Sequence, residues 1–509
     1  MQVLPTGEQE FVKIRAKNAL YIDKTNFAYQ IMTGNDYYFL SRPRRFGKSL
    51  FLNTLKEIFL GNKQLFEGLF IYDKIDWKTY PVVYIDFSKI DFKNAGLEEA
   101  IKIALAKNAL SYQIALETRT IGAQFEELIQ KLHSKTGEQV VILIDEYDKP
   151  ITEYLEDGQR AIEQRDILKS FYSIIKGTSA HIRLFFLTGV SRFAKVSVFS
   201  DLNNLTDLTF QKRYNNICGL TTDDLYSHFA DRLELAAEEN NLTLEETKAK
   251  IKEWYNGYSW DGENRVYNPF SILQFFGDNT FKNYWFETGT PTFLIKLLQP
   301  DFRFNLENTP VPPSIFDNYM VDKLEPISLL FQTGYLTVKH RTQFNNYVLD
   351  YPNQEVKDSM MQYLLADYAN KKEAAALSEN LILSIRNHDI KTFIDTINIL
   401  FSSIPSHIFI RKKESYYHSI IFIALKLAGF YISAEVNQAV GRLDAVLGYE
   451  NRIYIIEFKL DESADLAMAQ IHERNYAGAY LNQGKEIYLI GINFSSVLKK
   501  VEGWKMEKI

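Results

Sequence analysis

Short apolar runs separated by helical stretches mark the first part of the chain. The runs span residues 37–40, 81–87, 140–144 and 182–187. Each is rich in β-branched or aromatic residues and nearly continuous, which is typical of strands buried on both faces of a parallel sheet. Helical stretches, for example residues 49–60 and 97–116, lie between them. This alternation predicts an α/β domain over residues 1–210.

The middle of the chain has a mainly helical pattern with aromatic-rich loops. Thr243 and Glu246 have the spacing of a capping box, at the start of a helix that runs to Trp254. Residues 320–350 predict a helix followed by two short strands, and the residues after them are helical again. We therefore expect a helical lid with a winged-helix-like piece over residues 211–355, and a helical connector over residues 356–405.

Residues 406–509 change character once more. Helices are predicted over residues 414–428 and 464–480, and strands over residues 431–437, 442–448, 452–460 and 485–492. The order αβββαβ indicates a further small α/β domain.

Composition is that of a globular protein with more than one domain. With 509 residues and 46% hydrophobic content, the chain has room for roughly two to four domains. The single cysteine, Cys218, excludes an internal disulfide and a thiolate zinc cluster, and we expect it to be a small core residue. The first residues do not resemble a signal peptide, and no apolar run approaches the ~20 residues of a membrane helix. We expect a cytoplasmic protein without membrane contact.

The charge balance bears on nucleic-acid binding. Lys and Arg number 58 against 64 Asp and Glu, a net charge of −6. Any contact with nucleic acid must therefore use a local basic patch rather than a global field. From Phe401 to the end, 13 Lys and Arg face 12 Asp and Glu, so this part is the less acidic one. DNA contact is slightly favoured there.

A phosphate-binding loop is predicted at residues 41–50. Gly47, Lys48 and Ser49 follow a predicted strand and open a helix, as a Walker A loop requires. Main-chain amides at such a helix start cradle phosphates, the lysine reaches the β and γ phosphates, and the serine binds Mg²⁺. Arg42 replaces the usual first glycine, and an ordinary helix start is the alternative. The residues expected to line the nucleotide are Arg45, Phe46, Gly47, Lys48, Ser49 and Leu50.

The apolar strand predicted at residues 140–144 is followed by two acids, Asp145 and Glu146. We expect Asp145 to hold Mg²⁺ and Glu146 to orient the attacking water, although two acids could simply end a buried strand. Thr188, at the end of the next strand, is placed to sense the γ-phosphate or is a turn residue. Arg192 is either an arginine finger for a neighbouring subunit or a solvated surface arginine. Arg44 and Arg45 add charge at the phosphates or form salt bridges.

Two carboxylates and a lysine are predicted to meet on the C-terminal sheet. If a tight turn at residues 450–451 joins the flanking strands, Asp444 lies opposite Glu457 with Cβ atoms ~5 Å apart. Lys459 points to the same face. This set suits a metal-dependent phosphodiesterase, in which Asp444 and Glu457 bind Mg²⁺ or Mn²⁺ and Lys459 positions the water. The alternative is a surface salt-bridge network, which the strongly apolar strand around Glu457 disfavours.

Further ligands for this second site are sought on neighbouring elements. Glu414, on the preceding helix, is favoured over Glu435, on the first strand, as a third metal ligand. Gln470, on the following helix, binds a phosphate or the nucleophilic water, or is an exposed helix residue. His418 lies one turn after Glu414 and is expected to pack rather than to ligate.

With these residues in view, the chain resembles, almost end to end, a bacterial family that pairs an AAA-like ATPase domain with a PD-(D/E)XK nuclease domain. The family's phosphate loop is similar in beginning with Arg-Pro-Arg-Arg. The resemblance implies an ASCE-type P-loop sheet, ATP binding, a Mg²⁺-dependent nuclease fold and DNA as substrate, in defence or mobile-element biology. The stretches that carry it are residues 20–25, 42–49, 143–148, 187–192, 254–258, 266–270, 441–444 and 456–459.

Three functions agree with these residues. The first is an ATP-regulated DNA endonuclease, which the intact set of Asp444, Glu457 and Lys459 favours. The second is a sensor or signalling ATPase whose nuclease-like domain only binds nucleic acid or a protein partner. The third is a nuclease that keeps ATP as a structural ligand, against which Glu146 argues, since a non-hydrolysing site has little use for that acid. A homo-oligomer is an alternative to a monomer, because AAA-like sites often form at subunit contacts.

Overall fold

The computed structural model divides the chain into two compact units. The part of the chain that it describes consists of residues 1–192, 204–285, 306–316, 325–368, 371–402, 417, 420–421, 431–432, 436–438, 441–443, 445–449 and 451–509. Among these residues, the first unit runs to Val356 and the second begins at Lys357, inside α16 (Gln354–Tyr368). The finer division near residues 210 and 405 stays a proposal.

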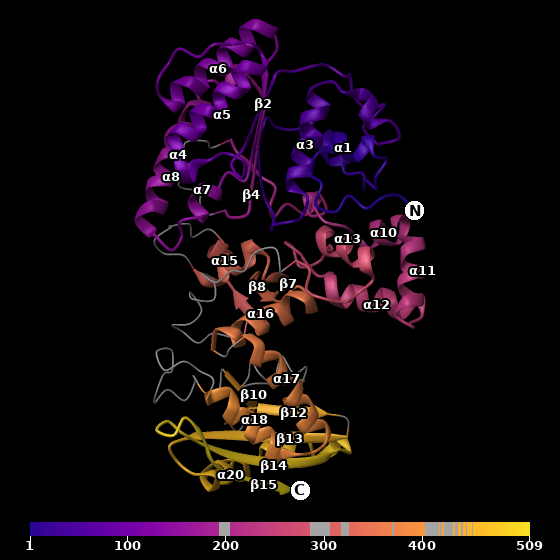
Figure 1. Ribbon diagram of the computed structural model, residues 1–509, viewed down its shortest axis with the longest axis vertical. Coiled ribbons are helices and arrows are strands. Elements are labelled where there is room, and N and C mark those ends of the chain that lie inside the picture. Colours follow the sequence, from indigo (N-terminus) through magenta and orange to yellow (C-terminus); the bar gives the residue numbers. More distant parts are fainter. Residues whose placement is uncertain are drawn as a thin grey trace. The chain divides into compact units, whose positions relative to one another are not determined.

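A parallel sheet forms the centre of the first unit (Figure 1). Its strands lie in the order β2-β3-β4-β1-β5, and all pair in parallel. The four apolar runs are confirmed as its longer strands, and the two-residue β5 adds an edge that was not predicted. Their bounds are β1 (Tyr37–Ser41), β2 (Val82–Asp86), β3 (Val140–Asp145), β4 (Ile182–Gly189) and β5 (Thr206–Asp207).

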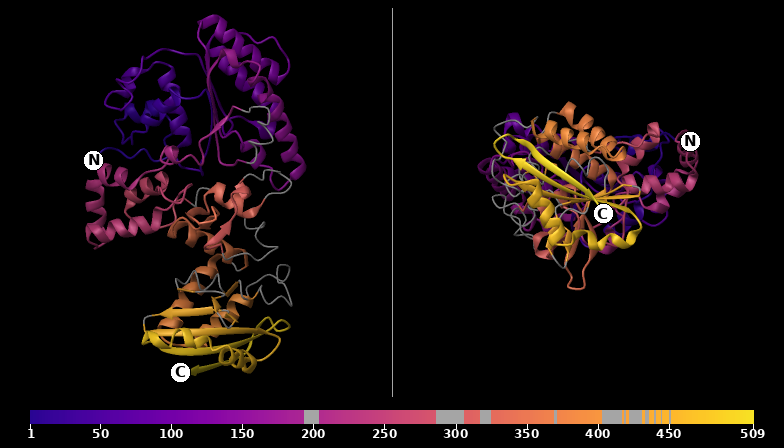
Figure 2. Two further views of the ribbon diagram at one scale, coloured as in Figure 1. Left: turned by 180° about the vertical axis from the view of Figure 1, so that it is seen from behind. Right: turned by 90° about the horizontal axis from the view of Figure 1, so that it is seen from below.

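Helices cover both faces of this sheet, which explains why its central strands are buried throughout. On one face lie α1 (Phe11–Ala16) and α3 (Lys48–Phe59). On the other lie α5 (Leu97–Ser111), α6 (Ile121–Thr136) and α8 (Gly158–Tyr172), as the view from behind in Figure 2 also shows. The carboxyl ends of β1, β3 and β4 meet at one edge, where the predicted site residues follow them.

A helical region follows the sheet in the same unit. Thr243 and Glu246 form the predicted capping box at the start of α12, through reciprocal side-chain and main-chain hydrogen bonds. The apolar core of this region also takes in Leu20 from the N-terminal segment. The helices are α10 (Thr222–His228), α11 (Ala230–Glu239), α12 (Leu244–Tyr255) and α13 (Pro269–Asp278).

The predicted helix and two strands before residue 355 are present, together with a third strand. The strands form a sheet in the order β6-β8-β7, beside α15 (Pro326–Thr333). Their bounds are β6 (Thr309–Val311), β7 (Thr337–Arg341) and β8 (Tyr347–Asp350). Beyond α16 come α17 (Lys371–Arg386) and α18 (Ile390–Ser402), so the stretch is helical as expected.

The second unit is built on a mixed sheet in the order β15-β14-β13-β12-β9. β13 and β14 are parallel, and the other pairs are antiparallel. The helix α20 (Ala464–Glu473) packs against β13 and β14. The other strands of the unit form a separate pair, β10 (Val436–Gln438) and β11 (Gly441–Leu443). The sheet strands are β9 (Tyr431–Ile432), β12 (Ala445–Tyr449), β13 (Arg452–Leu460), β14 (Glu486–Ser495) and β15 (Lys500–Lys508).

The α/β class with a helical middle is confirmed, but three details of the second unit differ from the prediction. The strand predicted over residues 442–448 is divided between β11 and β12. The helix predicted over residues 464–480 ends at Glu473, because Asn475 takes a left-handed conformation (φ 46°) that interrupts it. β15 was missed because its residues are mostly charged and exposed. Such a strand forms by pairing with β14, not by burying an apolar face of its own.

Among the described residues, none of the helices combines the length and the apolarity needed to cross a bilayer. The helix predicted over residues 414–428 lies largely outside the described residues, as do Glu414, His418, Glu435 and Asp444.

Candidate functional site

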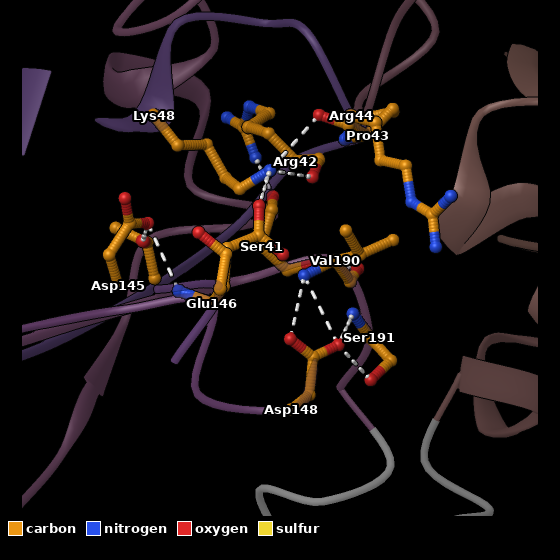
Figure 3. A network of polar contacts seen from close by, with 12 residues as sticks. Ser41, Arg42, Pro43, Arg44, Lys48, Asp145, Glu146, Asp148, Val190 and Ser191 are labelled. Atoms are coloured by element: carbon orange, nitrogen blue, oxygen red, sulfur yellow. Dashed lines mark hydrogen bonds and ion pairs between the residues drawn. The ribbon is translucent and has the colours of Figure 1, made fainter. Parts of the chain in front are cut away.

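The loop between β1 and α3 holds a buried lysine at its centre (Figure 3). Gly47 takes a left-handed conformation (φ 93°) immediately before α3. A residue with a side chain would be strained in this conformation. Lys48 is 3% exposed, and its Nζ donates to the main-chain oxygens of Arg42 (3.1 Å) and Pro43 (3.2 Å). The ammonium therefore lies inside the loop, at the amino end of a helix of 12 residues, where anions bind.

Arg42, at the position of the missing glycine, anchors the loop. Its guanidinium is fully buried and donates to the main-chain oxygens of Ser41 (2.8 Å), Thr209 (3.1 Å) and Tyr214 (3.0 Å). It also lies 3.8 Å over the Trp260 ring. Burial lowers the pKa of Arg42 to about 10, so the side chain stays charged at neutral pH. Within residues 42–47 the positive φ angles are at Arg45 and Gly47, so position 42 has no need of a glycine.

The other loop residues face different surroundings. Arg44 and Arg45 are exposed, and Arg45 lies 5.1 Å over the ring of Phe270. Phe46 is buried, with its ring edge-on to Tyr258 and Trp260. The side chains of Arg45 and Phe46 thus contact the helical region, and the main chain of the loop is left to contact a ligand.

Asp145 ends β3 as a buried carboxylate beside the loop. Its Oδ1 accepts a hydrogen bond from the Thr188 hydroxyl (2.5 Å) and one from the Glu146 amide (3.0 Å). Its Oδ2 is buried and makes no hydrogen bond of ordinary geometry with any described residue. Burial, with the neighbouring charge of Glu146, raises the pKa of Asp145 to about 6, although the Ser49 and Thr188 hydroxyls oppose the rise. A buried carboxylate oxygen without such a hydrogen bond, close to Ser49, is suited to bind a hard divalent cation.

Glu146 turns toward the loop in a strained conformation. Its φ is 51°, unusual for a residue with a side chain, and its Oε1 lies 3.5 Å from Lys48 Nζ. Its side chain is 21% exposed. Strain of this kind persists where the surroundings impose it, often at active sites. The arrangement leaves an accessible carboxylate beside the lysine of the loop.

Arg192 is largely buried and contacts residues of its own chain. Its side chain is 11% exposed, forms an ion pair with Asp207 (2.7 Å) and lies 4.7 Å over the Phe210 ring. Its amide donates to Gln332 Oε1 (2.6 Å). The interpretation as a solvated surface arginine is wrong, because these contacts hold it at the end of the segment that follows β4.

In the second unit, β12 and β13 pair in the predicted register. Ala445 lies opposite Ile456, and Tyr449 opposite Arg452, across the two-residue turn expected at residues 450–451. Asp444, the predicted partner of Glu457, lies outside the described residues. Glu457 is 2% exposed, on the sheet face that α20 covers.

Gln470, on α20, connects Glu457 to Lys459. Its Nε2 donates to Glu457 Oε1, and its Oε1 accepts from Lys459 Nζ (2.6 Å). Lys459 Nζ lies 3.9 Å from the same Glu457 oxygen. Gln470 is therefore not an exposed helix residue. A buried acid, a lysine and an amide form one polar cluster beside the apolar residues of β13.

Comparison with known proteins identifies both domains. Residues 5–199 match the family model described as "Predicted AAA-ATPase", and residues 412–504 match that of the PD-(D/E)XK nuclease superfamily. The chain is 39% identical over 524 residues to the "Uncharacterized protein in vnfD 5'region" of Azotobacter chroococcum mcd 1, with 99% of each chain covered. The chain belongs to the family that fuses these two domains. The predicted family resemblance is confirmed.

Residues beyond those predicted complete the edge of the AAA-ATPase domain. Asp148 is buried and accepts hydrogen bonds from the amides of Val190 (3.2 Å) and Ser191 (2.7 Å) and from the Ser191 hydroxyl (Figure 3). A β-carbon on Gly189 would lie 2.5 Å from Asp148 Oδ1. Asp148 therefore locks the segment that follows Thr188. The second aspartate of the stretch 143–148 was the available signal, but its partners are distant in sequence.

Among the described residues, no group of three or more His, Cys, Asp or Glu side chains is close enough to hold a metal ion. Of the predicted ligands, Ser49, Asp145 and Glu457 are described, whereas Glu414 and Asp444 lie outside this part of the chain.

Proposed function

We propose that this protein is an ATPase whose nucleotide state controls a Mg²⁺-dependent DNA endonuclease on the same chain. The observation that carries the proposal is that each domain holds a buried carboxylate close to a lysine. In the AAA-ATPase domain Asp145 is buried, and the next residue, Glu146, lies 3.5 Å from the Lys48 ammonium. In the nuclease domain the buried Glu457 and Lys459 share Gln470 as a hydrogen-bond partner. Buried charges are costly, and their presence in both clusters favours function in both.

In the ATPase domain, Lys48 and the main-chain amides before α3 bind the phosphates. Ser49 and Asp145 hold Mg²⁺, which neutralises charge on the phosphates. Thr188 keeps Asp145 Oδ1 engaged, so that Oδ2 faces the ion. Glu146 orients the attacking water.

In the nuclease domain, Asp444 and Glu457 hold Mg²⁺ or Mn²⁺, with Glu414 as a further ligand. The ion supplies a water of lowered pKa and stabilises charge on the scissile phosphate. Lys459 positions that water, and Gln470 orients both Lys459 and Glu457 through its two hydrogen bonds. The preferred substrate is DNA.

The test is nicking of supercoiled plasmid by the full-length protein with Mg²⁺ or Mn²⁺, with and without ATP. Asp444→Ala and Glu457→Gln are expected to abolish nicking, whereas Glu473→Gln, at an exposed position on α20, keeps it. Lys48→Ala is expected to remove any effect of ATP. Failure of the wild type to cut with any metal and nucleotide would overturn the nuclease assignment in favour of a sensor ATPase that only binds.

A further inference from the structure

β15 is an edge strand of the sheet in the second unit (Figure 1). Among the described strands it pairs with β14 alone, so its other main-chain edge has no strand partner there. It is nine residues long and contains no proline. An open edge is a template for a further strand, and natural edge strands are commonly short or interrupted for this reason. Charged residues can also protect an edge, so their pattern decides whether another strand fits.

The register with β14 determines which main-chain groups of β15 point away from the sheet. The amide of Ile509 donates to the Ile487 oxygen (3.1 Å), so these two residues form a hydrogen-bonded pair. Such pairs alternate with non-hydrogen-bonded pairs along an antiparallel ladder. The main-chain N–H and C=O groups of Trp504, Met506 and Lys508 therefore point outward, at the spacing that a further antiparallel strand requires.

The side chains of this segment present opposite charges on one face and apolar groups on the other. Lys505 and Glu507 each make a polar contact with a side chain of α20, so these two charges lie on the face that α20 covers. Trp504 and Met506 alternate with them and lie on the other face. They are 37% and 40% exposed, so two large apolar side chains meet water beside an open main-chain edge.

A second copy of β15 fits this edge in one antiparallel register. With Met506 of the two copies opposite each other, Lys505 of each copy lies opposite Glu507 of the other. These charge pairs occupy non-hydrogen-bonded positions, where facing side chains approach most closely. Sliding to the next register in either direction places Lys505 opposite Lys505, or Glu507 opposite Glu507, and like charges disfavour both. In the central register Trp504 also faces Lys508 of the second copy, as a cation–π contact requires.

We propose that two copies of this chain pair through β15 in the register centred on Met506, so that one continuous sheet runs through two nuclease domains. The charge pattern favours a second copy as the partner, because one sequence supplies both halves of the complementary pairs. Two nuclease sites in one particle can cut both strands of a duplex. That consequence rests on the proposed nuclease function, whereas the dimer itself does not.

Sedimentation velocity of the full-length protein without nucleotide, over a range of concentrations, tests the pairing. A single strand pair is a small interface, so we expect the wild type to dimerise with a dissociation constant of about 1–100 μM. Lys505→Glu and Glu507→Lys each place like charges at both charge pairs, and each is expected to weaken dimerisation at least about tenfold. Lys500→Glu makes the same change of charge on β15 outside the paired segment. It is the matched control and keeps the wild-type affinity.

Mixing the two charge variants separates the interface from any damage to the fold. In a mixed dimer the chain with Lys505→Glu meets the chain with Glu507→Lys, and both pairs regain opposite charges. We expect the mixture to associate with about the wild-type affinity, although each variant alone is weakened. Three results would overturn the proposal: single variants that dimerise like the wild type, a mixture no better than its components, or a wild type that stays monomeric at about 100 μM.

Discussion

Arg42 stands where a P-loop ordinarily has a glycine, and its guanidinium donates to three main-chain oxygens. Asp145 and Glu146 are neighbours in sequence with opposite surroundings, since Asp145 is buried and Glu146 is partly exposed in a strained conformation. The burial and the contacts of each side chain therefore decide its role. An arginine can hold a loop, one acid can hold a cation, and the next acid can face water.

Restoring the usual glycine by Arg42→Gly is expected to destabilise the protein. The change removes a buried cation and leaves three carbonyls without their donor, at a cost of about 3 kcal/mol or more. Thermal unfolding measures this, with the exposed Arg44→Gly as control. A melting temperature equal to that of the control would show that the anchor is dispensable.

The raised pKa of Asp145 predicts a pH dependence of Mg²⁺-dependent ATP binding. A carboxyl whose folded pKa is raised favours the protonated form, so its contribution to stability is present at low pH and is lost as pH rises through about 6. Binding of a cation requires the ionised form. ATP affinity with Mg²⁺ should therefore fall as pH drops from about 7.5 to about 5, and affinity measured with EDTA should not show the same fall. Parallel profiles would argue against Asp145 as the ligand.

Among the elements, the ends of the parallel strands and the packing of α20 on the second sheet decide where the functional groups lie. The carboxyl ends of β1, β3 and β4 gather Lys48, Asp145 and Thr188, because these strands are adjacent and parallel. α20 covers β13 and brings Gln470 onto Glu457. The geometry of the first site therefore depends on the order of the parallel strands, and that of the second on the packing of α20 against β13.

Gly189→Ala is expected to disturb the end of β4. The new β-carbon would lie 2.5 Å from both Asp148 Oδ1 and the Tyr147 ring, so the segment after Thr188 must shift. Overpacking of this kind costs about 2 kcal/mol. We expect a lower melting temperature and slower ATP hydrolysis. The matched control is Gly158→Ala, at the start of α8, where a β-carbon meets nothing within 4 Å. Equal behaviour of the two variants would contradict the predicted clash.

Gln470→Ala is expected to slow nicking about tenfold to a hundredfold without unfolding the nuclease domain. The side chain orients Lys459 and Glu457 through hydrogen bonds and is not itself proposed to ligate the metal. Glu473→Ala on the same helix is the control. A normal rate of nicking in Gln470→Ala would show that the two hydrogen bonds do not matter.

At the scale of the whole molecule, the first unit joins three parts of the chain around the phosphate loop. Arg42 reaches the Tyr214 oxygen and the Trp260 ring, and Phe46 packs on Tyr258, so the loop is built into the helical region. A nucleotide at the loop therefore contacts more than the sheet. We therefore expect a change of nucleotide state to alter contacts outside the parallel sheet as well.

Glu146→Gln should separate ATP binding from ATP hydrolysis. We expect turnover to fall about a hundredfold or more with ATP affinity nearly unchanged. With limited ATP, any effect of ATP on nicking should decay in the wild type and persist in the variant, because the ATP state is not consumed. Unchanged turnover would sink the assignment of Glu146. Identical nicking time courses would sink the coupling of the two domains.

The sequence by itself determined the four longer strands of the parallel sheet, the phosphate loop and the register of β12 with β13. These features rest on local signals: apolar runs of strand length, a glycine before a helix, and a two-residue turn that sets the pairing. Only the tertiary structure decided the role of Arg42, the ion pair of Arg192 with Asp207 and the hydrogen bonds of Asp148 to the segment after Thr188. Each of these depends on partners from distant parts of the chain, such as Tyr214 and Trp260 for Arg42. β15 belongs with them, because a charged edge strand is defined by the neighbour it pairs with and carries no apolar period of its own.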